Sequence, residues 1–252
     1  MGHFAINVGL SHQIGTARGR LSVLSAMDIS GDEFFAAFGK SINDLLVQHR
    51  EDLDRNRKML SKPDEPKMRW VDGTPEYSSY IYGLRKLFPE ALFVHIVRDV
   101  RDVVRSMLNF HRLAGYNLVA NEQAAYRLWL KAVSDCVQAE QAFGPQIVHR
   151  FQYSALIDNP EPAIRTLLEF LGESFFPRCL DPLAKRINSS DVPPDFKAED
   201  AATDAKLVEK STLLSRQLLT TSQSQESSSE AADVLQAAFE ERVKHLATTF
   251  RR

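Results

Sequence analysis

Residues 92–99 run Leu92-Phe93-Val94-His95-Ile96-Val97-Arg98-Asp99, an apolar stretch of strand length that closes with an arginine and an aspartate. Such near-continuous apolar runs are typical of interior strands in parallel sheets, whose two faces are both buried. We expect His95, in the middle of the run, to be a buried structural histidine. Asp99 suits the N-cap of a following helix, whose expected buried face comprises Val100, Val103, Val104, Met107 and Leu108.

The alternation of strands and helices extends outward from this stretch. On its N-terminal side, the pattern predicts a helix over 32–60, a short strand over 68–72 and a helix over 76–88. On its C-terminal side, it predicts a helix over 121–143, a strand over 147–153, and a helix that opens at Pro160 and stops at Gly172. Repetition of this kind predicts an α/β fold, a three-layer sandwich with a central parallel sheet.

The composition excludes several classes of protein. The 252 residues carry 31 Lys and Arg against 33 Asp and Glu, a formal charge of −2, so we expect no nucleic-acid partner. Cys136 and Cys179 make neither a disulfide framework nor a Cys-rich zinc site, and they fit a reducing compartment. The chain has no apolar run of about 18 residues and no signal-peptide pattern at Met1, so no membrane span and a cytoplasmic location are expected.

The composition changes toward the C-terminus. We expect an α/β domain over 1–195, followed over 196–252 by a linker and a helical tail. The serine-rich stretch TSQSQESSSE at 221–230 is typical of a flexible linker. Helical spacing returns from Val234 to Leu246, and this helix is expected to pack either on the body of the protein or on a partner. The sequence does not indicate an oligomeric state.

Arg98 is the first candidate for a functional role. It follows an interior strand, at the edge where open α/β sheets bind ligands, and a guanidinium holds a phosphate through two parallel hydrogen bonds. The alternative is a surface arginine paired with Asp99 or Asp102. Ser106 follows eight residues later and can offer a hydroxyl to the same anion. Residues 98–112 hold four arginines against two aspartates, a local charge of +2 that favours an anion site.

The chain resembles sulfotransferases that use 3′-phosphoadenosine-5′-phosphosulfate (PAPS). The resemblance covers residues 68–190 and rests on the joint order and spacing of several motifs, above all the eight-residue gap between Arg98 and Ser106. The motifs are WVDGTP (70–75), LFPEALFVHIVRD (87–99), RDVVRSM (101–107), YRLW (126–129), YSALIDNP (153–160), LLEFLG (167–172) and RINSS (186–190).

The resemblance implies a P-loop-NTPase-like sulfotransferase fold and transfer of a sulfuryl group from PAPS, without a metal, to a hydroxyl of a small-molecule or carbohydrate acceptor. It assigns the donor's 3′-phosphate to Arg98 and Ser106, and it places Tyr153 near the adenine. Tyr153 is equally well interpreted as an aromatic residue at the sheet edge. Asn188 and Ser189 fall in the family's late donor-contacting loop, although Asn-Ser-Ser is also a common turn.

One part of the family pattern is degenerate. The family's N-terminal phosphate loop has its nearest counterpart in residues 15–22, where Arg18 takes the place of the loop's cation. Arg20 and Leu21 stand where the loop has a glycine and a threonine, so a chance loop is the preferred interpretation. The fold is therefore expected either to lack its first strand–loop–helix unit or to carry a diverged form of it.

The sequence does not identify the base that would activate the acceptor. Glu76 is a candidate, but a glutamate after a proline also suits the start of a helix. His111, beyond the helix of Ser106, is a candidate for lining the acceptor pocket. The degenerate loop supports an alternative function, a catalytically inactive or truncated protein that binds nucleotide or acts as an interaction module. A kinase-like protein is disfavoured because no Gly-x-x-x-x-Gly-Lys-[Ser/Thr] loop is present.

Overall fold

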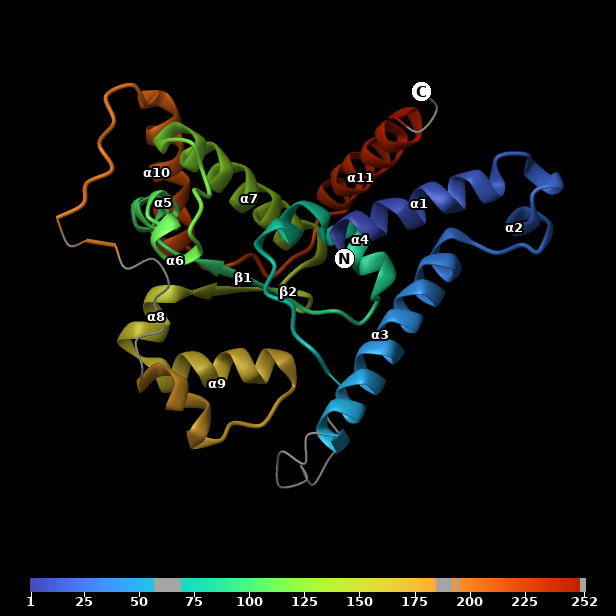
Figure 1. Cartoon of the computed structure of the whole chain (residues 1–252), viewed down its shortest axis with the longest axis horizontal. Helices are drawn as coiled ribbons and strands as arrows, with labels where there is room; N and C mark the ends of the chain where they lie inside the picture. Colours follow the sequence, from blue (N-terminus) through green and yellow to red (C-terminus); the bar gives the residue numbers. More distant parts are fainter. Residues whose placement is uncertain (57–68, 185–191, 194, 250–252) are drawn as a thin grey trace. The chain divides into compact units, whose positions relative to one another are not determined.

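The computed structural model describes residues 1–56, 69–184, 192–193 and 195–249 (Figure 1). The chain divides into two compact units. The first comprises Met1–Ala91 with Asp233–Arg252, and the second comprises Leu92–Ala232.

The first unit is helical. It contains α1 (Gly2–Thr16), η1 (Gly19–Leu21), α2 (Val23–Ala26), α3 (Gly31–Asn56), η2 (Pro75–Tyr80), α4 (Ile81–Leu87) and, from Asp233 onward, α11 (Ser229–Thr249). Its core joins side chains of four helices: Ala5, Ile6, Val8, Phe35, Leu87, Phe239 and Val243. Because Phe239 and Val243 are buried in this core, the C-terminal helix packs on the chain's own body.

Close backbone approach holds two helices of this unit together. Gly39 of α3 lies against the end of α4, where an added Cβ would stand 1.6 Å from the carbonyl oxygen of Leu87. Only glycine fits at such a contact, and the approach brings the apolar faces of α3 and α4 onto the shared core.

The second unit carries the sheet. Its elements are β1 (Phe93–Val97), α5 (Val100–Leu108), α6 (His111–Ala114), α7 (Glu122–Phe143), β2 (Val148–Gln152), α8 (Tyr153–Asp158), α9 (Pro160–Leu171), η3 (Pro177–Ala184) and α10 (Ala205–Thr220). The two strands are parallel, with Val97 paired to Gln152 at their carboxyl ends. Figure 1 shows α9 on one side of the strands and α7 and α10 on the other.

The predicted N-cap of α5 and both predicted ends of α9 are confirmed. Asp99 caps α5 by accepting a hydrogen bond from the Arg101 amide, and Asn121 caps α7 in the same way. Gly172 ends α9 in the left-handed conformation, at φ +67°. Val100 and Val104 of the predicted buried face are fully buried, against Trp129 and other residues of α7 and α10.

The predicted fold class holds only in part. The three-layer sandwich with a central parallel sheet reduces, within the described residues, to a two-stranded sheet in a mostly helical protein. The strand expected over 68–72 is wrong for residues 69–72. Val71 is 93% exposed and pairs with no strand among the residues that the structure describes. The Asp72 carboxylate turns the chain by accepting hydrogen bonds from the amide and hydroxyl of Thr74.

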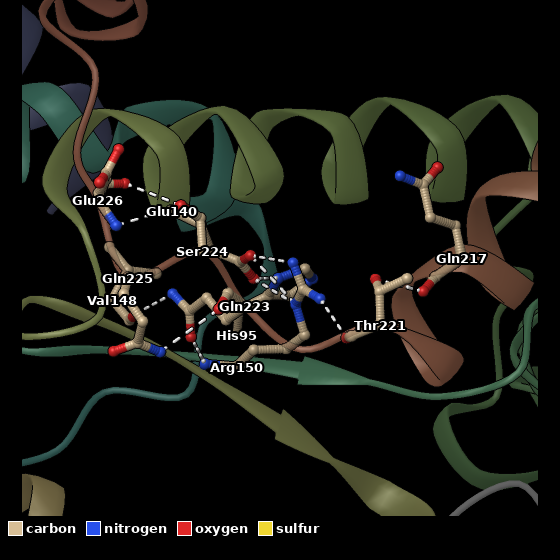
Figure 2. A network of polar contacts seen from close by, with 10 residues as sticks. All are labelled: His95, Glu140, Val148, Arg150, Gln217, Thr221, Gln223, Ser224, Gln225 and Glu226. Atoms are coloured by element: carbon tan, nitrogen blue, oxygen red, sulfur yellow. Dashed lines mark hydrogen bonds and ion pairs between the residues drawn. The ribbon is translucent and has the colours of Figure 1, made fainter.

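A buried charged network ties the sheet to α7 (Figure 2). The Nδ1–H of His95 donates to Glu140 at 2.6 Å, and Arg150, the register partner of His95, donates to both carboxylate oxygens. Burial would raise the pKa of Glu140, but the hydrogen bonds from His95 and Arg150 outweigh it and hold this pKa below its ordinary value. The expectation that His95 is a buried structural residue is confirmed.

Residues 221–228 lie along the outer edge of β2, where the sequence predicts a flexible linker; we call them the strap. The Gln223 side chain acts like a short neighbouring strand: its Oε1 accepts from the Arg150 amide, and its Nε2 donates to the Val148 carbonyl (Figure 2). Arg150 also donates to the carbonyl of Thr221, and the Ser228 amide donates to Gln141 of α7. The strap thus covers backbone groups that an edge strand would expose.

Among the described residues, no helix has both the length and the apolar character needed to traverse a bilayer.

Candidate functional site

The two strands end at one edge of the sheet, and the candidate site begins there. Because Val97 pairs with Gln152, the next residues, Arg98 and Tyr153, emerge at the same level. The guanidinium carbon of Arg98 lies 4.9 Å from the centroid of the Tyr153 ring, within the range of a cation–π contact. The structure therefore brings together two residues that are 55 positions apart in the sequence.

The Arg98 guanidinium is only partly paired. Its Nη2 lies 3.6 Å from Oδ2 of Asp102, so the predicted alternative, a pair with a nearby aspartate, is present. The two side chains are 32% and 47% exposed, and such half-exposed pairs contribute about 0–1 kcal/mol. The Nε atom is shielded from solvent and has no hydrogen-bond partner among the described residues. Donor capacity therefore remains for an anion.

Ser106 lies on the same face of α5 as Asp102. The two residues are four positions apart, which places them one above the other on a helix. Arg98 precedes the helix, and its guanidinium contacts Asp102. Asp102 is therefore a neighbour of both the Arg98 cation and the half-buried Ser106.

Arg105 adds a second guanidinium to this region. Its Nη2 donates to the carbonyl of Pro193 at 3.3 Å, which ties α5 to the chain that leads toward α10. Its Nε, like that of Arg98, is shielded and has no hydrogen-bond partner in the described part of the chain. Two of the four arginines in residues 98–112, Arg101 and Arg105, thus lie on α5.

The first backbone amides of α5 are already engaged. The Val100 amide donates to Oγ of Ser215 at 3.1 Å, and the Arg101 amide donates to the Asp99 carboxylate. A helix N-terminus attracts anions through its free amides, but these two are taken. An anion at this site would therefore be held chiefly by side chains.

The remaining predicted residues lie elsewhere or outside the described residues. Arg18 and Glu76 are exposed residues of the first unit. Asn188 and Ser189 fall outside the described residues. His111 is exposed at the start of α6, with its Nδ1 3.2 Å from the carbonyl oxygen of Leu108.

The stretch over 15–22 does not have the strand–loop–helix form of a phosphate loop. The helix α1 continues to Thr16, and a turn and the short η1 follow. The Arg18 amide donates to Oγ of Ser22 at 2.8 Å, so one amide that a phosphate loop would offer is used within the turn. The interpretation of this stretch as a chance loop fits this geometry.

Sequence reasoning missed α10 and its Ser215. The signal was present in Asp204, which caps the helix by accepting from the Lys206 amide, and in the apolar residues Leu207, Val208, Leu214 and Leu218. Two serines, Ser211 and Ser215, occupy buried positions and interrupt that apolar stripe. In the described residues, no group of three or more His, Cys, Asp or Glu side chains is arranged to hold a metal ion.

The model of the sulfotransferase family matches residues 23–177, more than half of the chain. An omega-hydroxy-beta-dihydromenaquinone-9 sulfotransferase of Mycobacterium bovis is 32% identical over 122 residues, 44% of this chain and 31% of that protein. Protein-tyrosine sulfotransferase 1 of Danio rerio is 31% identical over 119 residues, 45% of this chain and 32% of that protein.

The matched regions span 31–40% of the length of the curated relatives. A solved structure, the sulfotransferase domain from the curacin biosynthetic pathway, aligns over 89% of this chain and 76% of its own, with a TM-score of 0.40 and 18% identity.

Proposed function

Since the chain belongs to the sulfotransferase family, we propose that it binds PAPS beside Arg98 and transfers the sulfuryl group to a hydroxyl of a small-molecule or carbohydrate acceptor. The observation that carries this proposal is the Arg98–Tyr153 contact at the ends of the two parallel strands. It combines a cation for a phosphate with an aromatic ring for a base, at the edge where α/β sheets bind ligands.

The residues at this edge fit the donor nucleotide. We assign the 3′-phosphate to Arg98 and Ser106, because the guanidinium retains an unpartnered Nε within the described residues and Ser106 shares the helix face of Asp102. We assign the adenine to the neighbourhood of Tyr153, whose ring already stacks with the guanidinium. Asn188 and Ser189 remain proposed donor contacts.

The chemistry needs positioning and charge more than a reactive side chain. Bound PAPS supplies an activated sulfuryl group, and transfer in line with the leaving phosphate places negative charge on the surrounding oxygens. By analogy with phosphoryl transfer, fixed cations lower the free energy of that arrangement. In this proposal Arg98 anchors the nucleotide through its 3′-phosphate, Arg18 is the proposed cation for the sulfuryl end, and Glu76 is the proposed base that takes the acceptor's proton.

Two relatives guide the choice of acceptor. Their names give a protein tyrosine and an omega-hydroxy compound, both of which carry a hydroxyl. For this chain we therefore propose an oxygen acceptor rather than an amine. The test is transfer of radiolabelled sulfate from PAPS to a panel of phenols, primary alcohols and sugars. Turnover with at least one hydroxyl acceptor supports the proposal.

A second function is favoured by the form of residues 15–22. Since this stretch has no strand–loop–helix geometry, the chain can keep the 3′-phosphate contacts while lacking the means to hold the sulfuryl end. The protein would then bind nucleotide without turnover. Binding of 3′-phosphoadenosine-5′-phosphate (PAP) with no sulfate transfer to any acceptor supports this second function. Turnover that is lost in Arg18→Ala excludes it.

A further inference from the structure

We infer that Ser215 of α10 is a positioning residue for the nucleotide site, because its hydroxyl fixes the first turn of α5 and thereby the place of Arg98. The inference rests on the proposed function, since it concerns how the chain receives the 3′-phosphate of PAPS or PAP. It gives a role to a helix that lies outside the residues matched by the family model.

The contact joins two residues that lie close together in space and far apart in the sequence. The Val100 amide donates to Oγ of Ser215 at 3.1 Å across a separation of 115 residues. Val100 is the first residue of α5 and stands two positions after Arg98. Ser215 is 1% exposed and Val100 is fully buried, so water does not replace this bond.

A helix leaves its first amides without partners inside the helix. In α5 the Asp99 carboxylate serves the Arg101 amide, and Ser215 is the partner of the Val100 amide. Loss of this partner leaves a buried amide without a hydrogen bond, which destabilises the first turn and allows it to fray or shift. Arg98 adjoins that turn, and its contact with Asp102 depends on the direction in which α5 leaves the strand.

The packing around Ser215 allows this hydrogen bond to be removed while α5 and α10 stay in contact. Leu207, Val208 and Leu214 of α10 pack with Val100 and Val104 in one cluster, so α10 is held against α5 independently of the hydroxyl. Replacing Ser215 by alanine removes the acceptor and leaves these apolar contacts. The expected effect is therefore a local change at the start of α5 rather than loss of the helix pair.

Ser211 provides a matched control. It lies one turn earlier on α10 and is fully buried, but its hydroxyl donates to the Leu207 carbonyl within the same helix. Ser211→Ala therefore removes a buried serine hydroxyl of α10 without removing a partner of α5. Any general effect of a serine-to-alanine change in this core appears in both variants.

The experiment compares two ligands that differ at one group. PAP and adenosine 5′-phosphate are titrated by calorimetry into the wild-type chain, Ser215→Ala and Ser211→Ala. We expect Ser215→Ala to weaken PAP binding about tenfold, the equivalent of one buried hydrogen bond, and to leave the affinity for adenosine 5′-phosphate within about twofold. Ser211→Ala should bind both ligands as the wild type does. Faster amide exchange at Val100 in free Ser215→Ala is the expected independent signature.

Equal loss of affinity for both ligands, or the same loss in Ser211→Ala, would overturn the inference, because a general structural role would produce it. If Ser215→Ala does not fold, Ser215→Cys takes its place, since sulfur is a weak acceptor of similar size. A wild-type chain that does not bind PAP overturns the proposed function, and the inference with it. The wild-type titration alone identifies that case.

Discussion

The guanidinium of Arg98 stacks over the ring of Tyr153, 4.9 Å from its centroid, and so links the residues that follow β1 and β2. Each residue is placed by its strand, and the strands are held in register by the ladder that ends at Val97 and Gln152. The contact therefore depends on the sheet rather than on a flexible loop. This is the arrangement on which the proposed nucleotide site rests.

Tyr153 should contribute through its ring rather than its hydroxyl. Tyr153→Phe keeps the face over Arg98, whereas Tyr153→Ala removes it, along with the surface proposed for the adenine. Cation–π contacts of this kind are worth about 0.5–2 kcal/mol. We expect PAP affinity to be near wild type in Tyr153→Phe and about three- to thirtyfold weaker in Tyr153→Ala, measured by calorimetry. Equal losses in both variants would assign the role to the hydroxyl.

Asp102 should oppose the binding of an anion. Its carboxylate lies 3.6 Å from the Arg98 guanidinium and competes with a phosphate for it. Asp102→Asn is expected to tighten PAP binding about two- to fivefold, with unfolding free energy changed by less than about 1 kcal/mol. Asp135→Asn is the control, since it removes the same charge from the i,i+4 pair with Lys131 on α7. Weaker PAP binding in Asp102→Asn would show instead that this carboxylate orients Arg98.

The strap should stabilise the second unit through Gln223. Gln223→Ala removes hydrogen bonds to the Arg150 amide and the Val148 carbonyl and uncovers the edge of β2. The expected loss is about 1–3 kcal/mol of unfolding free energy, measured by urea denaturation. Gln225→Ala removes a side chain that donates to the strap's own backbone at Gln223, and it should change the unfolding free energy by less than about 0.5 kcal/mol. Similar losses in the two variants would contradict the role of Gln223.

Glu140 should make stability depend on pH in acid. Its pKa lies below the ordinary value of 4.5 in the folded chain, so the unfolded chain binds the proton more readily. This contribution to stability is complete above pH 4.5 and is lost as the pH falls below it. Thermal unfolding of the wild type should shift to lower temperature across that range.

Glu140→Gln tests the origin of that dependence. The variant leaves Arg150 and His95 without their carboxylate and should lose about 3–5 kcal/mol at neutral pH. Its melting temperature should then fall less steeply in acid than that of the wild type. Glu161→Gln, in an exposed pair with Arg165, should retain the wild-type slope. An unchanged acid slope in Glu140→Gln would place the dependence on other groups.

The strands and caps near the site could be predicted from local patterns. Asp99 precedes a helical apolar stripe and follows a strand, and the structure puts it at the N-cap as expected. The placement of Arg98 at a strand end followed from the same pattern. These features depend on a few neighbouring residues, which is why sequence spacing captures them.

Features that depend on distant contacts could not be predicted in this way. α10 was missed because Ser211 and Ser215 stand at buried positions where an apolar residue is expected, and the reason for one of them, the Val100 amide, lies 115 residues away. The strand over 68–72 was expected from its local pattern, but a strand needs a neighbour, and Val71 pairs with no strand in the described part of the chain. Likewise, Gln223 sits in a serine-rich stretch whose order comes from the edge of β2.

The proposed nucleotide site is tested by calorimetric titration of PAP into the wild-type chain, Arg98→Ala and Arg101→Ala. Arg101 is exposed on α5, so its replacement removes the same charge without touching the Tyr153 stack. We expect PAP to bind the wild type and Arg101→Ala, and to bind Arg98→Ala at least about tenfold more weakly, the loss of one charged hydrogen bond. PAP affinity that is the same in Arg98→Ala as in the wild type would contradict the proposed site.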